Sequence, residues 1–205
     1  MVQNKVQAII FDMGGVLVRT VDPTRRTILA KRYGMTYQEI DALVFGSETA
    51  RLATVGQIPE ENHWDSIAVQ LKLSKQELDQ FQADFWTGDE LNQELVSFIK
   101  EIHSSQKTGL LSNAWSGARA SLASKFSFLH LFDVSVFSAE IGMAKPDPRF
   151  YDWILNKLGV QAAESIFVDD FLVNIEAAQA LGFMTVHFKD NKQTLLELKT
   201  LITTK

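Results

Sequence analysis

Four short segments, far apart in the chain, carry residue types that could transfer a phosphoryl group. Each places a polar side chain in a turn or near the end of an expected strand. The segments are Asp12 in IIFDMGGVLV, Ser112 and Asn113 in GLLSNAW, Lys145 in GMAKPDP, and Asp169 and Asp170 in SIFVDDFLVNIEAA. Together they supply a carboxylate nucleophile, a hydroxyl group, an ammonium group and a second pair of carboxylates. This combination suits phosphoryl transfer supported by Mg²⁺.

Asp12 follows an apolar run and enters a turn that contains Gly14 and Gly15. Glycines let the backbone approach a ligand closely and leave N–H groups free to face an anion, so we assign Gly15 to phosphate binding. A carboxylate at this position can attack phosphorus and form an aspartyl-phosphate. Taken alone, Asp12 fits equally well a residue that only shapes the turn.

Asp169 and Asp170 follow another apolar run and precede an expected helix. Adjacent carboxylates raise each other's pKa unless a cation or a lysine neutralises them. Mg²⁺ is the expected occupant, because it prefers oxygen ligands and takes one or two carboxylates together with substrate phosphate. The alternative is that Asp170 caps the helix and Asp169 is solvated. The buried strand expected before the pair favours the metal site.

Lys145 lies in a turn that is held rigid by the two prolines that follow it in AKPDP. Its ammonium group could neutralise both a phosphate and the Asp12 carboxylate. The Ser112 hydroxyl and the Asn113 amide could hydrogen-bond a phosphate oxygen, although Ser-Asn is also ordinary turn chemistry. A lone lysine is usually a surface residue. Each motif alone is weak evidence, whereas their joint order and placement are strong evidence.

The elements that must position these residues are expected to form an α/β fold. Several apolar runs are continuous rather than alternating, which indicates strands covered on both faces. Helical patterns alternate with them and predict a parallel sheet with helices on both faces, where ligands bind at the carboxyl ends of strands. The expected strands are 6–11, 108–112, 134–138, 165–168 and 184–188, and the expected helices between them are 91–104, 116–125, 148–158 and 172–181.

Residues 20–88 have no convincing strand and predict only amphipathic helices, at 23–33, 36–45, 60–71 and 74–85. Two of these helices begin with a Ser/Thr-x-x-Glu capping box, at Thr36 and Ser74. We therefore predict a catalytic core formed by residues 1–19 and 89–205, with a helical cap at 20–88. An insertion directly after the first strand would cover the site as a lid that excludes water. The alternative is a purely structural subdomain.

Composition restricts the classes of function. The chain has 205 residues, 46% hydrophobic and 22% charged, with a net charge of −5 and no cysteine. Nucleic acid is an unexpected partner without a basic face, and cysteine chemistry is excluded. Neither a secretory signal nor a membrane-spanning run is visible, so a soluble, cytoplasmic protein with no membrane partner is expected. The expected partner is a small phosphorylated metabolite, and the oligomeric state is not predicted.

These motifs resemble those of the haloacid dehalogenase-like (HAD) hydrolase superfamily over essentially the whole chain. The stretch DDFLVNIEAAQALGF looks especially similar to the phosphatase domains of epoxide hydrolases and to bacterial sugar-phosphate phosphatases. The resemblance implies a Rossmann-like core with an inserted helical cap. It also implies the following roles: Asp12 as nucleophile and metal ligand, Ser112 as phosphate ligand, Lys145 as charge stabiliser, Asp170 and the Gly14 carbonyl as metal ligands, Asp169 beside them paired with Lys145, and Asn174 as support for the metal site.

Gly14 is a departure from the pattern of the family phosphatases, which usually have a second aspartate there. That residue protonates the leaving group and later activates water. General acid–base catalysis contributes about 10²–10⁴-fold, equivalent to about 3–5.5 kcal/mol of barrier. We expect a Mg²⁺-dependent phosphatase, with a sugar phosphate as one candidate substrate and a good leaving group favoured. The alternatives are a metal-independent 2-haloacid dehalogenase, which also lacks the second aspartate, and a non-catalytic HAD-like binding protein.

Other polar and aromatic residues carry weaker signals. Amphipathic helices place such side chains on solvated faces in any case, so we expect a structural rather than a functional part for each member of the cap set. That set is Arg19, Arg25, Arg26, Arg51, His63 and Trp64. Trp115 is expected either to form a wall of the pocket or to pack under the cap. His103, His130 and His187 show no ligand spacing and receive no role.

Overall fold

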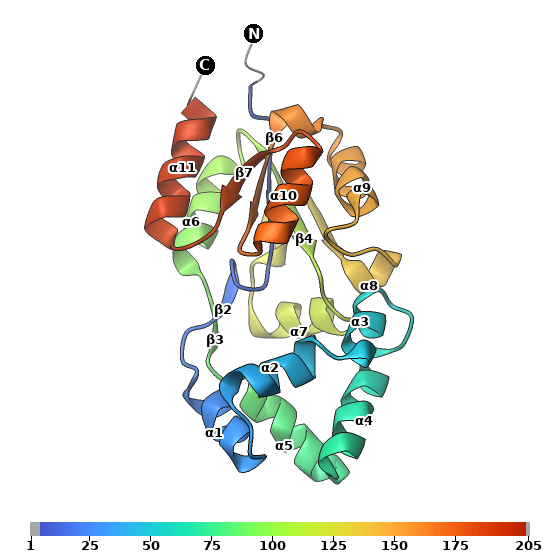
Figure 1. Ribbon diagram of the computed structural model, residues 1–205. Helices are drawn as coiled ribbons and strands as arrows, with labels where there is room; N and C mark the ends of the chain where they lie inside the picture. Colours follow the sequence, from blue (N-terminus) through green and yellow to red (C-terminus); the bar gives the residue numbers. More distant parts are fainter. Residues whose placement is uncertain (1–4, 204–205) are drawn as a thin grey trace.

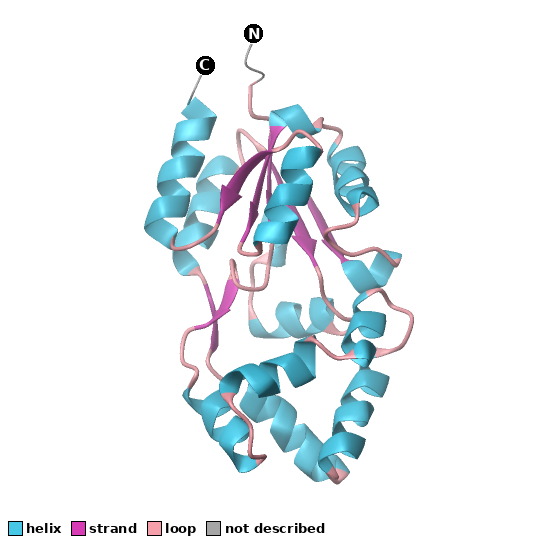
Figure 2. Ribbon diagram, in the orientation of Figure 1, coloured by secondary structure: helices cyan, strands magenta, loops and turns pink. Residues whose placement is uncertain are grey.

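A parallel five-stranded sheet forms the centre of the fold (Figures 1 and 2). The computed structural model describes residues 5–203. Its sheet strands are β1 (Ala8–Phe11), β4 (Lys107–Ser112), β5 (Val134–Phe137), β6 (Ser165–Asp169) and β7 (Met184–His187), in the order β5-β4-β1-β6-β7. The expected α/β fold is confirmed. Each expected strand of the core is present, with ends that shift by at most two residues.

Helices cover both faces of the sheet because its strands are apolar on both sides. Ile9 and Phe11 of β1 join a core with helices α6 (Gln93–Ile102) and α11 (Asn191–Thr203). Ala8 and Ile10 face the opposite way and join a second core with α9 (Pro148–Leu158) and α10 (Leu172–Ala180). Alternate residues of one strand therefore contribute to two cores, as the period of a strand requires. Helix α11 was not among the expected elements.

The strand order brings the candidate residues to one edge. β1 lies between β4 and β6. The next strand of this sheet along the chain, β4, lies on one side of β1, and the later strand β6 lies on the other side. Phe11 pairs with Leu110 of β4 and with Val168 of β6. The residues that follow these positions, including Asp12 and Asp169, therefore emerge side by side at the carboxyl edge. Such a switch point is where parallel sheets bind ligands.

A group of five helices lies beyond this edge, in the lower half of Figure 1. They are α1 (Thr24–Arg32), α2 (Tyr37–Phe45), α3 (Glu48–Thr54), α4 (Glu60–Leu71) and α5 (Lys75–Trp86), and they enclose a hydrophobic core of their own. Both expected capping boxes form, at Thr36 and Ser74. Helix α3 was not predicted, because its seven residues are too short for a clear period. The division at residues 20–88 stays a prediction.

Two short strands connect the helical group to the sheet. β2 (Val18–Thr20) and β3 (Asp89–Leu91) pair antiparallel, where the sequence predicted no strand and a helix from Leu91. That prediction is wrong, since α6 begins only at Gln93. Asn92 defines the start, because its side-chain oxygen accepts a hydrogen bond from the Leu95 N–H at 3.3 Å. Three-residue strands carry too little pattern to be recognised in a sequence.

Trp115 provides a second attachment between the two parts. It lies in the loop after β4, yet its side chain belongs to the core of the helical group. Its indole Nε1 donates to the Ala50 carbonyl at 3.3 Å and to Thr54 Oγ1 at 3.2 Å. Nearby, the Gly117 N–H donates to Glu60 Oε2 at 2.9 Å. Of the two expectations for Trp115, packing under the cap is the one observed.

Several expected structural residues of the cap are buried in it. His63 and Trp64 belong to α4, and the His63 ring lies 4.6 Å from the Trp115 ring. Burial lowers the pKa of His63, so the side chain is neutral near pH 7.

Among the described residues, none of the helices combines the length and the apolar character that crossing a membrane requires.

Arg26 is the buried cation of the helical group. It donates to Asp41 at 2.9 Å and to the Phe85 carbonyl at 3.1 Å, and its guanidinium lies 4.0 Å from the Phe85 ring centre. A further ion pair at 3.4 Å reaches Asp89 of β3. Arg26 therefore joins α1 to α2, to α5 and to the connecting strands.

Arg26→Ala is expected to lower the free energy of unfolding by about 3 kcal/mol, because Asp89 loses its cationic partner and the Phe85 carbonyl loses its donor. Urea denaturation followed by circular dichroism measures this loss. Arg25→Ala, an exposed neighbour on the same helix, should change the free energy by less than about 0.5 kcal/mol. Equal losses for the two variants would contradict the assignment.

Candidate active site

A buried lysine links two carboxylates at the carboxyl edge of the sheet. Lys145 Nζ donates to Asp12 Oδ1 at 2.5 Å and to Asp169 Oδ2 at 2.7 Å, and only 1% of its side chain is exposed. Asp12 comes from the end of β1 and Asp169 from the end of β6. The pairing of Lys145 with Asp169 that the resemblance implied is present. Residues 133 and 24 positions apart thus form one charged cluster.

Asp169 is held by several donors at once. Besides Lys145, the Phe171 N–H donates to its Oδ1 at 2.8 Å, and Asn174 Nδ2 lies 3.0 and 3.1 Å from its two oxygens. Tyr151 in turn donates its hydroxyl to the Asn174 carbonyl at 3.0 Å. Because its oxygens are already occupied, Asp169 is suited to hold Lys145 rather than to bind a metal directly. Asn174 acts on the site through Asp169.

Asp170 is arranged differently from its neighbour. Its Oδ1 is buried without a hydrogen-bond partner in the described structure. Its carboxylate packs against Gly15 so closely that a Cβ built there would lie 2.2 Å from Oδ2. Gly15 also has a φ of +77°, which favours glycine. Asp170 does not cap α10: Phe171 precedes that helix and no side chain caps it.

His187 contributes a contact that the sequence did not predict. Its Nε2 lies 3.0 Å from the Asp170 carbonyl oxygen, within hydrogen-bond distance. The pairing of β7 with β6 places His187 beside Asp169. The expectation that His187 has no role as a ligand stays a prediction, and the contact shows that His187 supports the backbone of the Asp169–Asp170 turn. Only the strand register reveals this contact, and no spacing in the sequence indicates it.

Ser112 and Asn113 have different parts at the end of β4. Ser112 Oγ is buried and has no hydrogen-bond partner in the described structure, so it is free to bind a ligand oxygen. Asn113 was also expected to bind phosphate, which stays a prediction, and its side chain has a structural part as well. Its Nδ2 donates to the Lys145 carbonyl at 2.9 Å, and its Oδ1 accepts from the Lys145 N–H at 2.8 Å. Asn113 thus fixes the backbone of the lysine.

Burial and like charge shift the pKa values of the cluster. Burial, followed by the charge of Asp169, raises the pKa of Asp12 to about 7 despite the neighbouring Lys145. The same two causes raise the pKa of Asp170 to about 6. Burial alone would lower the pKa of Lys145, but Asp12 and Asp169 outweigh it and raise the pKa. Three carboxylates with one ammonium leave an excess of negative charge that favours a cation.

The oxygen atoms fit a hard divalent cation. One carboxylate oxygen from each of Asp12, Asp169 and Asp170 lies within 4.8 Å of the others. Asp170 Oδ1 lacks a partner, and in the described part of the chain no hydrogen bond reaches the Gly14 carbonyl. Oxygen donors of this kind are the ligands that Mg²⁺ prefers. Asp12, Asp170 and the Gly14 carbonyl, with Asp169 beside them, therefore fit the metal that the resemblance implies.

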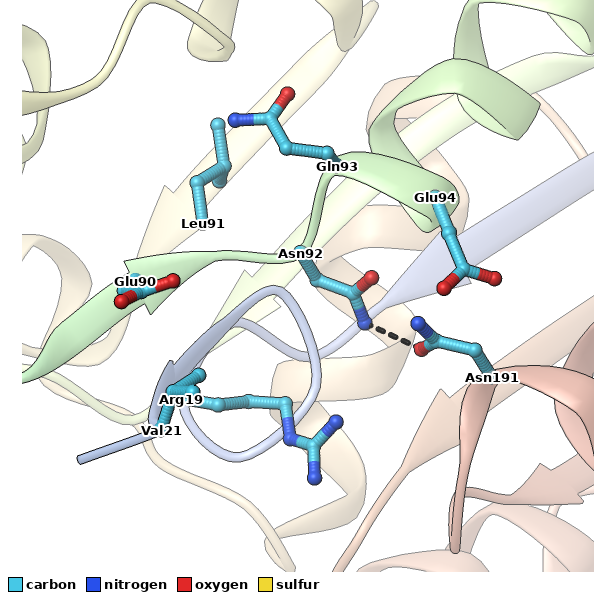
Figure 3. A pocket seen from close by; sticks show the side chains of 8 residues that line it. All are labelled: Arg19, Val21, Glu90, Leu91, Asn92, Gln93, Glu94 and Asn191. Atoms are coloured by element: carbon cyan, nitrogen blue, oxygen red, sulfur yellow. Dashed lines mark hydrogen bonds between the residues drawn. The ribbon is translucent and has the colours of Figure 1, made fainter. Parts of the chain in front are cut away.

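A surface pocket of about 200 Å³ lies elsewhere, between the connecting strands and the start of α11 (Figure 3). Arg19 extends along it, and Asn92 donates to Asn191 at 2.7 Å across one side. Glu90 and Glu94 also line it, so its charge is mixed and does not favour phosphate. Arg19 is the one cap candidate found there, and the catalytic candidates do not line this pocket.

Comparison with known sequences agrees with the chemistry that the geometry of the site favours. The family model for haloacid dehalogenase-like hydrolases matches residues 6–182. A phosphatase of Mycobacterium tuberculosis is 30% identical over 184 residues, which are 86% of this chain and 84% of that protein. A sesquiterpene phosphatase of Aspergillus oryzae is 47% identical over 72 residues, 35% of this chain and 37% of the relative. This second match covers little more than a third of the relative's length.

A solved structure confirms the fold. A HAD family enzyme of Bacteroides thetaiotaomicron, crystallised with magnesium and inorganic phosphate, superposes with a TM-score of 0.75 at 22% identity. The match covers 90% of this chain and 94% of that one. The helical group and the sheet are therefore both parts of a known arrangement.

Proposed function

The chain belongs to the haloacid dehalogenase-like hydrolase family, and from this premise we propose that it is a Mg²⁺-dependent phosphatase acting on a small phosphorylated metabolite. The observation that carries the proposal is the pair of unpartnered buried oxygens, Ser112 Oγ and Asp170 Oδ1, at the edge where Asp12 and Lys145 meet. One can bind a phosphate oxygen and the other a cation. Relatives that are themselves named phosphatases support the same reaction class.

Asp12 is the proposed nucleophile. One of its carboxylate oxygens forms a bond to phosphorus while the bond from phosphorus to the leaving oxygen breaks, and the leaving group takes the electron pair. Attack by water on phosphorus then releases phosphate and restores the carboxylate. Lys145 remains hydrogen-bonded to Asp12 and offsets the charge of the transferring group. Ser112 donates its hydroxyl to a phosphoryl oxygen. Gly15 was also expected to bind phosphate, but its N–H already donates to the Val18 carbonyl at 2.9 Å, so it is not counted as a donor here.

The positioning groups keep Lys145 in place during attack. Asn113 holds its backbone by two hydrogen bonds, and Asp169 holds its ammonium group. Mg²⁺ would be held by Asp12, Asp170 and the Gly14 carbonyl, with Asp169 beside them, and it would neutralise phosphate charge when bound. Gly14 has no side chain to protonate the leaving group. Substrates whose leaving group departs readily are therefore favoured.

The test is a screen of phosphorylated metabolites in Mg²⁺ that measures release of inorganic phosphate. Turnover of at least one phosphate monoester, lost when EDTA removes the metal, is the expected result. A parallel assay follows chloride release from 2-chloropropionate. Chloride release with no phosphatase activity on any substrate would overturn the proposal.

A haloacid dehalogenase is the second candidate, and Gly14 is the observation that favours it, because a halide leaves without a proton. Such an enzyme would still use Asp12, Ser112 and Lys145. It would have no use for the Asp170 carboxylate, which is buried against Gly15 with one oxygen free. Phosphatase chemistry accounts for that costly group, and we therefore rank it first.

Mg²⁺ is expected to raise the melting temperature on the order of 5 °C, and more at pH 8 than at pH 5. The folded-state pKa values of Asp12 and Asp170, about 7 and about 6, exceed the ordinary value of 3.8. The folded protein therefore binds more protons than the unfolded chain, and metal-free stability falls as pH rises from 3.8 through about 7. The cation binds ionised carboxylates and offsets this loss.

Differential scanning fluorimetry at both pH values, with and without Mg²⁺, measures the effect. Asp170→Asn removes a proposed ligand and should reduce the shift caused by Mg²⁺ at pH 8 to near zero. A shift at pH 5 equal to that at pH 8 would show that these carboxylates do not control metal binding.

A further inference from the structure

An exposed apolar run begins immediately after Asp170. Phe171, Leu172 and Val173 are 62%, 54% and 53% exposed, although large hydrophobic residues usually pack inside a protein. They form the first turn of α10 and the residue before it. Consecutive helical residues point about 100° apart, so this end of the helix is apolar on several sides at once. The candidate active-site residues do not use these side chains.

The position of the run is fixed relative to the candidate site. The Phe171 N–H donates to Asp169 Oδ1 at 2.8 Å, which ties the start of the run to the carboxylate that holds Lys145. Asp170, the preceding residue, packs against Gly15 in the turn after Asp12. Adjacent Cα atoms are about 3.8 Å apart. The apolar run therefore borders the site at the carboxyl edge of the sheet.

Charge divides this region into two halves. Lys145, Asp12 and Asp169 make one half ionic, whereas residues 171–175 (FLVNI) contain no charged side chain. The proposed Mg²⁺ would offset the excess negative charge of the carboxylates, and the ligand that then complements both halves has an anionic end and an uncharged, apolar end. A sugar phosphate has the first but not the second, because its hydroxyl groups favour polar partners.

Resting on the proposed phosphatase activity, we propose that the substrate is the phosphate monoester of an apolar, acidic alcohol of the phenol class. Its ring would lie against Leu172 and Val173 while its phosphate reaches Asp12 and Ser112. The phenol class also explains how the reaction can proceed although Gly14 provides no general acid. A phenol ionises near pH 10, about six units below water, and so it leaves as the anion more readily than an aliphatic alcohol.

The step balances without a protein acid. The carboxylate oxygen of Asp12 forms a bond to phosphorus, the bond from phosphorus to the phenolic oxygen breaks, and the phenolate keeps the electron pair. Solvent then protonates the phenolate after it leaves the site. Water cleaves the aspartyl-phosphate at phosphorus, which releases inorganic phosphate and returns Asp12 to its starting form.

The test compares phenyl phosphate with glycerol phosphate as substrates of the full chain in Mg²⁺. We expect kcat/KM to be at least about tenfold higher for phenyl phosphate. In the double variant Leu172→Ser with Val173→Ser, the ratio of the two kcat/KM values should fall about tenfold, mainly through KM for phenyl phosphate. Serine is tolerated in the first turn of a helix, so the variant should fold.

The matched control is Val69→Ser with Leu196→Ser, which replaces two apolar side chains that are 81% and 67% exposed on α4 and α11. This control should leave both kcat/KM values unchanged. Equal use of the two substrates by the wild-type protein would overturn the proposal while the phosphatase assignment stands. No phosphate release from any monoester would instead sink the phosphatase assignment itself.

Light scattering at the assay concentration tests a competing explanation, namely that the apolar run is an interface between copies of the chain. The proposal is wrong if three results are found together: the wild-type protein is a dimer, the Leu172→Ser/Val173→Ser variant is a monomer, and the substrate ratio is unchanged. In that case the run is an interface between copies of the chain. A falling ratio with an unchanged oligomeric state supports the substrate surface.

Discussion

Replacing Asp12 by asparagine should lower kcat by at least about 10⁴-fold on every phosphorylated substrate. Asparagine has nearly the same shape but cannot form the aspartyl-phosphate. The loss should not come from unfolding, because Asp12 carries a burial penalty that an uncharged amide avoids. We therefore expect Asp12→Asn to melt at the same temperature as the wild type or above it. Phosphate release and thermal melting together check both parts.

Asp152→Asn is the matched control for this variant. Asp152 is exposed on α9, the helix that begins three residues after Lys145, and the substitution makes the same chemical change away from the site. Its kcat should equal that of the wild type. Retained turnover in Asp12→Asn would mean that another group attacks phosphorus, and a large drop in its melting temperature would mean that Asp12 is mainly structural.

Gly14→Asp should raise kcat on a poor leaving group such as glycerol by about 10²-fold, because it supplies the missing proton donor. The structure leaves room for it: a Cβ built on Gly14 meets nothing within 4 Å. The gain should shrink as the leaving group becomes more acidic, since a phenolate needs little help from an acid. Turnover of glycerol phosphate and of phenyl phosphate by the same variant measures this difference.

Two variants separate acid catalysis from other effects of the substitution. Gly14→Asn has the shape of the aspartate but cannot donate a carboxyl proton, so it should show none of the gain. Gly15→Ala tests the neighbouring position, where the added Cβ would collide with Asp170 and where φ is +77°. It should lose metal binding and activity. Equal gains from Gly14→Asp and Gly14→Asn would rule out the missing-acid explanation.

The sequence predicted the sheet and the edge where the candidate residues meet because both depend on strong, local patterns. The runs before Asp12, Ser112 and Asp169 are continuously apolar, and only buried parallel strands account for several such runs alternating with helices. Because the ends of parallel strands meet at one edge, those residues can be placed together without predicting the structure of the loops. The pairing of Lys145 with Asp169 came instead from the family resemblance.

What the sequence could not predict depends on contacts between segments that have no pattern in common. The amide of Asn113 binds the backbone of Lys145, 32 residues away, and no spacing in the sequence indicates this contact. His187 meets Asp170 only through the register of β6 and β7. The connecting strands β2 and β3 are three residues long, and their pairing joins positions about 70 residues apart.

The placement of Trp115 has a consequence for building chimaeric enzymes. Exchanging residues 20–88 for the cap of a relative would leave this indole facing a foreign interior without its partners Ala50 and Thr54. The same loop begins at Asn113, directly after Ser112 at the end of β4, so a misfit there would reach the proposed phosphate site. A graft with a chance of working must therefore carry the loop from Ala114 to Gly117 together with the cap, as one transferable module.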